Sequence, residues 1–140
     1  MGNYQKHARD VVREDFHVAV YKDKYPVTEG HLLFVPKYNT ISIVMQAMED
    51  ALREGRRGVE LKDWDGFNVG INYGEASGQT VMWPHIHFMP RHKDDIEGFP
   101  GSVRLACRHG KNASYYFEHP DFKEEYTQAH LELKNKKGLI

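Results

Sequence analysis

The sequence predicts an α+β fold, and three observations support this prediction. Short apolar runs at 16–21 and 31–36 have the length and the β-branched or aromatic content of strands. Residues 41–52 carry apolar side chains three and four positions apart, which is typical of an amphipathic helix. Residues 66–72 alternate between apolar and small or polar side chains, which indicates a further strand. Strands mixed with one clear helix define the α+β class.

The first two predicted strands follow a polar N-terminal stretch. Residues 1–14 are polar and charged, and we interpret them as a lead-in that is partly helical. The first strand, Phe16–Tyr21, precedes residues 23–30, which contain a proline, end in a glycine and are therefore predicted to be a loop. The second strand, His31–Pro36, is apolar at consecutive positions, so we expect both of its faces to be covered.

The main helix is predicted to begin at Asn39 and to end at Glu54. Its apolar positions lie on one face and are Ile41, Val44, Met45, Met48, Ala51 and Leu52. Asn39 and Thr40 both carry side-chain oxygens that can cap the first turn. Gly55 and Gly58 indicate where the helix stops, because glycine is common just past a helix end.

A hairpin is predicted after this helix. The strand at 66–72 is followed by a turn at 73–78 and by a second strand at 80–90, so the two strands should pair antiparallel. Beyond this point the chain is polar and then aromatic-rich. We expect a shorter helix there, from about 121 to 135.

The composition excludes several classes of function. The 140 residues include 19 Lys+Arg and 20 Asp+Glu, for a net charge of −1. This balance argues against a protein that binds polymeric nucleic acid, which needs a basic face. No run approaches the roughly 18 apolar residues of a membrane span, so we expect no membrane association. A single cysteine, Cys107, cannot form an internal disulfide, and we expect a cytoplasmic protein.

Two histidines near the end of the hairpin are the sharpest feature of the sequence. On a strand, His85 and His87 point to the same face. They can be solvated strand histidines, ligands of a zinc ion together with His92, or a catalytic pair, because histidine is partly neutral at pH 7 and can act as a nucleophile. Neutral polar groups nearby favour catalysis on a phosphoryl group, whose oxygens they can hold. These groups belong to Asn72, Gln79 and Thr80.

Three motifs in matching order resemble the histidine triad (HIT) superfamily. Its signature is His-φ-His-φ-His-φ-φ, where φ is apolar, preceded by a Gly-Gln-Thr/Ser-Val step. Residues 85–91 (HIHFMPR) and 78–81 (GQTV) match these two motifs, and residues 26–37 (PVTEGHLLFVPK) match the family's other characteristic segment. The similarity in order and spacing extends over residues 16–91.

The resemblance implies a HIT-like domain over residues 1–140, with 1–14 as its polar lead-in and 92–140 as a C-terminal part in which the similarity is weak. It implies an antiparallel sheet of about five strands, one main packed helix and a shorter terminal helix. It also implies a homodimer.

The resemblance further implies a catalytic role for three histidines. His85 matches the nucleophile that attacks the α-phosphorus and becomes nucleotidylated. His87 matches the histidine that donates a hydrogen bond to the phosphate or the leaving group. His31 matches a histidine that helps to fix the tautomer of the nucleophile, which is the orienting role known from catalytic triads.

Substrate-binding roles are implied for a second set of residues. Asp23 matches the position that holds the ribose hydroxyls, and Tyr21 and Phe16 fall near the expected base pocket. The residues matched to the neighbourhood of the phosphate are Asn72, Gln79 and Thr80.

One position departs from the family pattern. Trp83 occupies the place of the first triad histidine, and Pro84 replaces the apolar residue after it. The first histidine supports the nucleophile and does not attack, so the nucleophile itself is retained. Because the Trp83 indole can donate a hydrogen bond but cannot accept or relay a proton, we expect slower or retuned chemistry. We include Trp83 among the substrate-binding residues.

The leading hypothesis is a nucleotide hydrolase or transferase that cleaves at the α-phosphate of a nucleoside phosphate derivative through nucleotidyl-His85. The expected partner is a nucleotide or dinucleoside polyphosphate, and no cofactor or metal is expected for the covalent step. The alternative is a non-catalytic or weakly active nucleotide-binding protein with a degenerate triad. The third hypothesis is a metal-binding protein that uses His85, His87 and His92.

Overall fold

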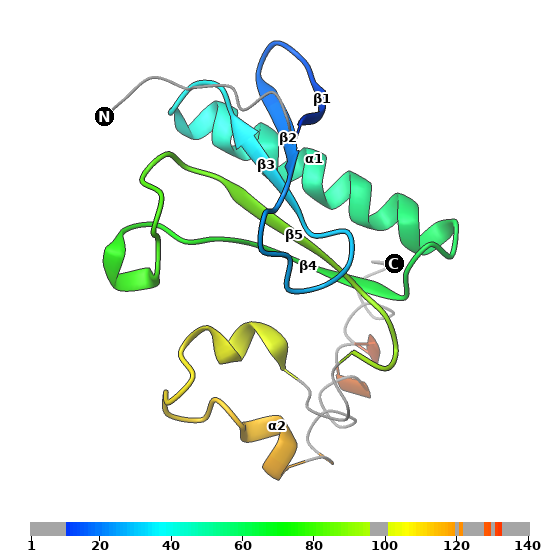
Figure 1. Cartoon of the computed structure of the whole chain (residues 1–140). Helices are drawn as coiled ribbons and strands as arrows, with labels where there is room; N and C mark the ends of the chain where they lie inside the picture. Colours follow the sequence, from blue (N-terminus) through cyan, green and yellow to red (C-terminus); the bar gives the residue numbers. More distant parts are fainter. Residues whose placement is uncertain (1–10, 96–100, 120, 122–127, 130, 133–140) are drawn as a thin grey trace. The chain divides into compact units, whose positions relative to one another are not determined.

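Five antiparallel strands form one sheet in the first of the two compact units into which the chain divides, residues 1–93 and 94–140 (Figure 1). The computed structural model describes residues 11–95, 101–119, 121, 128–129 and 131–132. No described helix is both long and apolar enough to cross a membrane. The assignment of residues 1–140 to one domain stays a prediction.

The strands lie in the order β1-β2-β3-β5-β4, and each neighbouring pair is antiparallel. Their bounds are Val11–Glu14 (β1), Val18–Lys22 (β2), Leu32–Pro36 (β3), Gly66–Ile71 (β4) and Ile86–Arg91 (β5). β3 and β5 are distant in sequence but adjacent in the sheet, with Leu33 opposite His87. β4 and β5 form the predicted antiparallel pair, with Gly70 opposite His87. The predicted α+β class and five-stranded sheet are confirmed.

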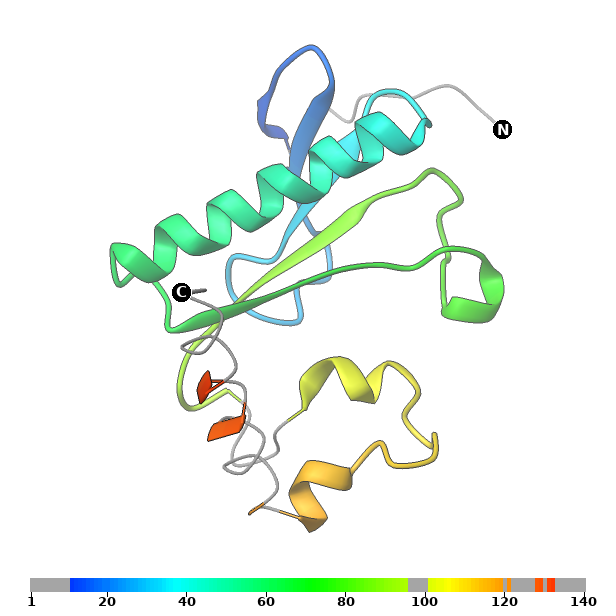
Figure 2. The same ribbon diagram turned by 180° about the vertical axis from the view of Figure 1, so that it is seen from behind.

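Helix α1, Ile41–Glu60, covers one face of the sheet, as the opposite views in Figures 1 and 2 show. Thr40 caps this helix, because its hydroxyl oxygen accepts the Ile43 N–H at 3.3 Å. The core between α1 and the sheet consists of Val18, Val20, Phe34, Ala47, Ala51, Ile86 and Phe88. Ala47 and Ala51 are the core residues from the helix, and their small side chains let α1 approach the strands closely.

The strand register divides the sheet into two faces, and the face away from α1 carries the predicted catalytic residues. Val20, Phe34 and Ile86 stand in one cross-strand row and belong to the core beneath α1. Because side chains alternate along a strand, His87 points to the opposite face. His85, two positions earlier, is expected to share that face with His87.

The end of the main helix differs from the prediction. α1 continues through Gly55 and Gly58 to Glu60. A Cβ atom at Gly55 would lie 2.5 Å from the Phe67 ring, and one at Gly58 would lie 2.0 Å from the Trp64 indole. Both glycines are therefore required by close packing against aromatic rings, and they do not end the helix.

The last four residues of the N-terminal lead-in form strand β1 and are not helical, while residues 1–10 of the predicted, partly helical lead-in lie outside the described residues. Arg13 and Glu14 pair with Val20 and Ala19 of β2. Only Val11 of the four is partly buried, and the other three are exposed. The strand is thus specified by its pairing with β2 and carries no apolar pattern of its own.

Strand β5 begins at Ile86, later than the predicted start at Thr80. The preceding residues form a loop that includes a 3₁₀ turn at Glu75–Ser77. Pro84 has no N–H to donate to a neighbouring strand, so the ladder starts only after it. The loop therefore extends to the residue that precedes the strand, which is His85.

In the second unit, the structure describes a 3₁₀ turn, Ser102–Ala106, and a short helix, α2, Tyr115–Glu118. The Arg104 guanidinium donates a hydrogen bond to the Asn112 carbonyl at 3.2 Å. The shorter helix predicted for about 121–135 lies mostly outside the described residues.

Candidate active site

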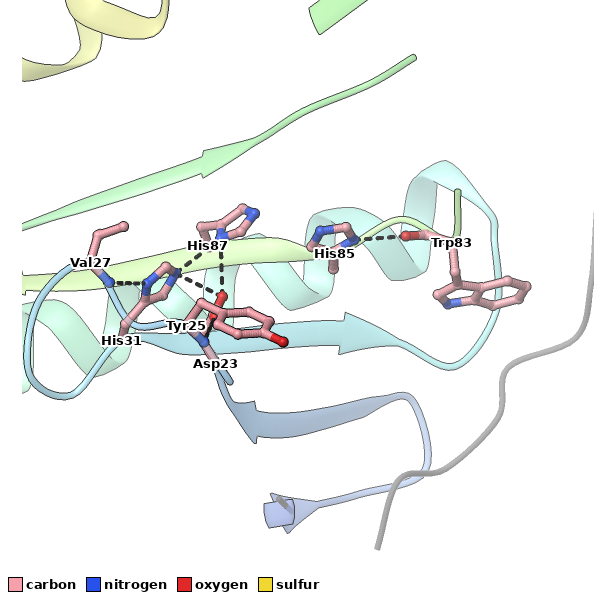
Figure 3. Close-up of polar contacts among 7 residues, drawn as sticks. All are labelled: Asp23, Tyr25, Val27, His31, Trp83, His85 and His87. Atoms are coloured by element: carbon pink, nitrogen blue, oxygen red, sulfur yellow. Dashed lines mark hydrogen bonds and ion pairs between the residues drawn. The ribbon is translucent and has the colours of Figure 1, made fainter. Parts of the chain in front are cut away.

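The three histidines predicted to be catalytic lie together on the face of the sheet away from α1 (Figure 3). His31 directly precedes β3, His85 directly precedes β5, and His87 is the second residue of β5. The pairing of β3 with β5 brings His31 Nε2 to 3.0 Å from His87 Nδ1. The ring centroids of His85 and His87 are 5.1 Å apart. Sheet topology therefore assembles the site from residues that are far apart in the sequence.

The hydrogen bonds determine which ring nitrogens carry protons in the His31–His87 pair. The Val27 N–H donates to Nδ1 of His31 at 3.2 Å, so this nitrogen carries a lone pair. Neutral His31 then carries its proton on Nε2, and this N–H donates a hydrogen bond to Nδ1 of His87. Neutral His87 must hold its own proton on Nε2, across the ring from His31. The pair thus presents an N–H donor on the outer side of His87.

A backbone carbonyl sets the tautomer of His85. Nδ1 of His85 lies 2.8 Å from the Trp83 carbonyl oxygen, which can only accept a hydrogen bond (Figure 3). Nδ1 therefore carries the proton, and Nε2 of neutral His85 carries the lone pair. Since His85 is only half-buried, that lone pair is available to an electrophile.

Asp23 lies beside the histidine pair, and one of its carboxylate oxygens is held by a backbone N–H. Its Oδ1 accepts the Tyr25 N–H at 2.7 Å. Its Oδ2 lies 3.4 Å from His31 Nε2 and 3.9 Å from His87 Nδ1. The backbone N–H of Asp23 also donates to the His31 carbonyl at 3.1 Å. The carboxylate therefore faces the histidine pair, and its contact with a ribose stays a prediction.

Burial favours the neutral form of both paired histidines. Desolvation lowers the pKa of His31, and the Asp23 carboxylate opposes part of that shift. Desolvation is also the largest cause that lowers the pKa of His87, followed by repulsion from protonated His85 and His31, while Asp23 again opposes the shift. The pKa shifts agree with the proton positions that the hydrogen bonds require.

Trp83 is attached to strand β3. Its indole Nε1–H donates to the Pro36 carbonyl at 2.7 Å, and its side chain is half-buried. The indole N–H is therefore engaged by the protein itself and is not open to a substrate.

The residues predicted to contact the phosphate occupy three different environments. Gln79 is buried, and its side chain spans the loop: Oε1 accepts the Gly74 N–H at 2.7 Å and Nε2 donates to the Val81 carbonyl at 2.9 Å. It shapes the loop in this structure, and its predicted contact with a phosphate stays a prediction. Thr80 is exposed, and Asn72, directly after β4, is half-buried. Their contacts with a phosphate stay predictions.

The two residues expected near the base differ in exposure. Tyr21 is only 6% exposed and Phe16 is 90% exposed. Tyr21 is thus buried within the protein, while Phe16 is open to solvent, and their part in a base pocket stays a prediction.

The groups that the sequence analysis missed are backbone groups, the Val27 N–H and the Trp83 and Pro36 carbonyls, for which no side-chain motif exists.

The ligands of the third hypothesis, His85, His87 and His92, do not form a metal-binding group among the described residues. His92 faces Asp65, with Nδ1 4.0 Å from Oδ2. Among the described residues, the set that could hold a metal is Asp23, His31 and His87, whose donor atoms lie 3.0–3.9 Å apart. Donors around tetrahedral zinc lie about 3.3–3.4 Å apart, so the spacing is suitable.

The proton arrangement opposes a metal at this set of ligands. A zinc ion on Nε2 of His31 would leave the ring proton on Nδ1, directed at the Val27 N–H 3.2 Å away. Two donors would then face each other. The hydrogen bond from Val27 therefore favours a proton between His31 and His87.

Comparisons with known proteins agree with the motifs. A family model described as HIT domain matches residues 5–94. A HIT-like protein of Methanocaldococcus jannaschii is 36% identical over 96 residues, which cover 62% of this chain and 72% of that protein. Adenylylsulfatase HINT3 of Arabidopsis thaliana is 32% identical over 89 residues, which cover 59% of this chain and 45% of that protein. The crystal structure of a zinc-bound histidine triad family protein from Mycobacterium smegmatis has a TM-score of 0.57 at 28% identity, and the match covers 79% of this chain and 86% of that one.

Proposed function

The chain belongs to the HIT family, and on that premise we propose that it is a nucleotide hydrolase or transferase that cleaves at the α-phosphorus of a nucleoside phosphate derivative. The covalent intermediate is nucleotidyl-His85. The observation that carries this proposal is the hydrogen bond from His85 Nδ1 to the Trp83 carbonyl, 2.8 Å long, because it leaves the Nε2 lone pair free to attack.

In the covalent step, His85 supplies the attacking electron pair and the substrate supplies the leaving group. The Nε2 lone pair of His85 forms a bond to the α-phosphorus, and the bond from phosphorus to the leaving group breaks, so the leaving group departs with that electron pair. The imidazole now carries phosphorus on Nε2 and a proton on Nδ1, and is positive. The Trp83 carbonyl, which accepts the hydrogen bond from Nδ1–H, stabilises this charge. Attack by water or by another nucleophile breaks the phosphorus–nitrogen bond, whose electron pair returns to Nε2 of neutral His85, and the nucleophile's proton is released to solvent with the nucleotide product.

His87 supports the same step as a hydrogen-bond donor. With its proton on Nε2, it can hold a non-bridging oxygen of the α-phosphate as charge develops there. A neutral imidazole does not supply a proton to the leaving group, so the site suits leaving groups that depart as stable anions. The relative named an adenylylsulfatase supports chemistry at an α-phosphate of this kind. In the same proposal, Asp23 holds the ribose, and Asn72 and Thr80 contact the phosphate.

A second candidate function is a nucleotide-binding protein with little or no turnover. The observation that favours it is Trp83 at the position of the first triad histidine. Replacement of Trp83 by His distinguishes the two candidates. A large gain in turnover with unchanged nucleotide affinity would favour a degenerate triad in the natural protein.

We further infer a homodimer, with a second copy of the chain as the occupant of an exposed apolar stripe on α1. The stripe consists of Ile41, Met45, Leu52 and Val59, which recur at intervals of four and seven positions and are each at least 40% exposed. Strand β4 lies at an edge of the described sheet, and an edge can extend by pairing. In light scattering, we expect Leu52→Glu to be monomeric and Ser42→Glu, on an exposed helix position outside the stripe, to stay dimeric. A monomeric natural protein would exclude this interface.

Turnover of a dinucleoside polyphosphate tests the proposed function. The natural protein should hydrolyse it faster than a nucleoside phosphoramidate with the same base, because the amine leaving group needs a proton. His85→Asn should reduce turnover to background. His92→Asn is the matched control, since His92 lies outside the histidine cluster, and it should keep the natural rate. If His85→Asn retains that rate, the proposed mechanism is incorrect.

A further inference from the structure

We propose that Trp83 is a positioning residue that holds His85 in its reactive tautomer. Its side chain is attached to β3, while its carbonyl binds the imidazole of His85. This inference rests on the proposed function, in which His85 is the nucleophile. It gives the residue at the first triad position a specific task, although tryptophan cannot relay a proton.

The first contact of Trp83 is with a rigid part of the sheet. Its Nε1–H donates to the Pro36 carbonyl at 2.7 Å across 47 positions of sequence. Pro36 is the last residue of β3, lies opposite Val18 of β2, and has a fully buried side chain. The next residue, Lys37, donates its N–H to the His17 carbonyl at 2.7 Å. The acceptor of the indole N–H is therefore held by the neighbouring strand.

The second contact of Trp83, made by its carbonyl, fixes the imidazole of His85. Only Pro84 separates Trp83 from His85, and Pro84 is buried. Its ring restricts φ, so the short segment has little freedom once Trp83 is fixed. The Trp83 carbonyl then stands 2.8 Å from His85 Nδ1 and keeps the proton on that nitrogen. Without the attachment, the carbonyl can move away and the imidazole can exchange its proton to Nε2, which removes the attacking lone pair.

The chain contains a matched control for this bond. Trp64 also donates its indole N–H to a backbone carbonyl, that of Gly55, at 3.0 Å, and it is also half-buried. It packs against Phe88 and the helix, on the α1 side of the sheet. Replacement of Trp64 by Phe therefore removes the same kind of hydrogen bond without a contact to the histidine cluster.

Two measurements on Trp83→Phe and Trp64→Phe test the proposal. We expect Trp83→Phe to lower kcat about tenfold, the effect of about 1.4 kcal/mol on the barrier, with KM changed less than about twofold. In ¹⁵N NMR spectra, His85 should change from the Nδ1–H tautomer to a mixture of both. Trp64→Phe should leave kcat and the His85 tautomer unchanged. If Trp83→Phe matches Trp64→Phe in both measurements, Trp83 does not position His85.

A second substitution covers the case in which Trp83→Phe does not fold. Benzothienylalanine at position 83 keeps the shape of the indole and replaces its N–H by sulfur, so the same losses are expected. Retention of the natural tautomer and kcat in this variant would overturn the proposal. The NMR comparison requires no turnover. Absence of nucleotidyl-His85 in the natural protein would therefore reject the proposed function, while the tautomer comparison would still decide the role of Trp83.

Discussion

Nε2 of His31 and Nδ1 of His87 lie 3.0 Å apart, and the Val27 N–H determines which of them carries the shared proton. This chain of hydrogen bonds begins in the loop before β3 and ends at the outer nitrogen of His87. A backbone donor thus fixes the direction of two side-chain hydrogen bonds. The same principle operates at His85, where a backbone carbonyl fixes the proton.

Replacement of His31 by Leu should interrupt this chain. His87 would lose the donor at its Nδ1, and its ring would be free to present a lone pair to the phosphate. We expect turnover to fall about tenfold, because one donor to the phosphate is worth about 1.4 kcal/mol of barrier. His31→Gln, which retains an N–H donor, should lose less activity. Equal rates in the natural protein and His31→Leu would show that the hydrogen-bond chain has no part in the reaction.

Acid should destabilise the fold through the same pair. The folded state lowers the pKa values of His31 and His87, so the unfolded chain binds more protons once the pH falls below the ordinary histidine value. Stability is fully present above about pH 7 and decreases as the pH falls through about 6.5, by up to roughly 1.4 kcal/mol per pH unit for each histidine. Urea unfolding at pH 7.5, 6.5 and 5.5 measures this slope. His87→Gln should show a shallower slope than the natural protein, and an unchanged slope would contradict this account.

The parts of the site that depend on the two-residue period of a strand could be predicted from the sequence. The period of two placed His85 and His87 on one face, and the structure confirms this arrangement, with ring centroids 5.1 Å apart. The antiparallel pairing of the strands predicted at 66–72 and 80–90 also followed from local pattern and turn chemistry, and the structure pairs 66–71 with 86–91. In contrast, the contacts of Gln79 with the backbone of its own loop depend on the loop's path, which no pattern specifies.

The fold departed from prediction where distant residues decide the local structure. Gly55 and Gly58 have the sequence signature of a helix end, but they lie inside α1 because Phe67 and Trp64 occupy the space of their missing side chains. β1 is a strand because β2 pairs with it. Neither contact can be inferred from the residues of the segment itself.

Replacement of Gly58 by Ala should therefore destabilise the protein, although alanine favours an isolated helix. The added Cβ would lie 2.0 Å from the Trp64 indole, and overpacking of this kind costs about 1–3 kcal/mol. Thermal unfolding should show a lower Tm. Gly66→Ala is the control, because no heavy atom lies within 4 Å of its added Cβ. A Gly58→Ala protein as stable as Gly66→Ala would mean that the helix tolerates the side chain by moving.

Replacement of Gln79 by Glu should loosen the loop before Trp83. A glutamate keeps the acceptor for the Gly74 N–H but cannot donate to the Val81 carbonyl. Loss of this hydrogen bond and a charge at the buried position 79 should cost about 1–3 kcal/mol, and limited proteolysis should cut the loop at 74–81 faster. Thr80→Ala, at an exposed neighbouring position, should be cut at the natural rate. Identical cutting of all three proteins would remove the loop-shaping role of Gln79.

The intact mass of the protein during turnover tests the central claim most directly. After rapid mixing with a dinucleoside polyphosphate and an alkaline quench, we predict an added mass of one nucleotidyl group, located on His85 by peptide analysis and absent from His85→Asn. The phosphorus–nitrogen bond should be lost in acid and retained in alkali. Steady turnover without any adduct, or an adduct on another residue, would contradict the assignment of His85 as the nucleophile.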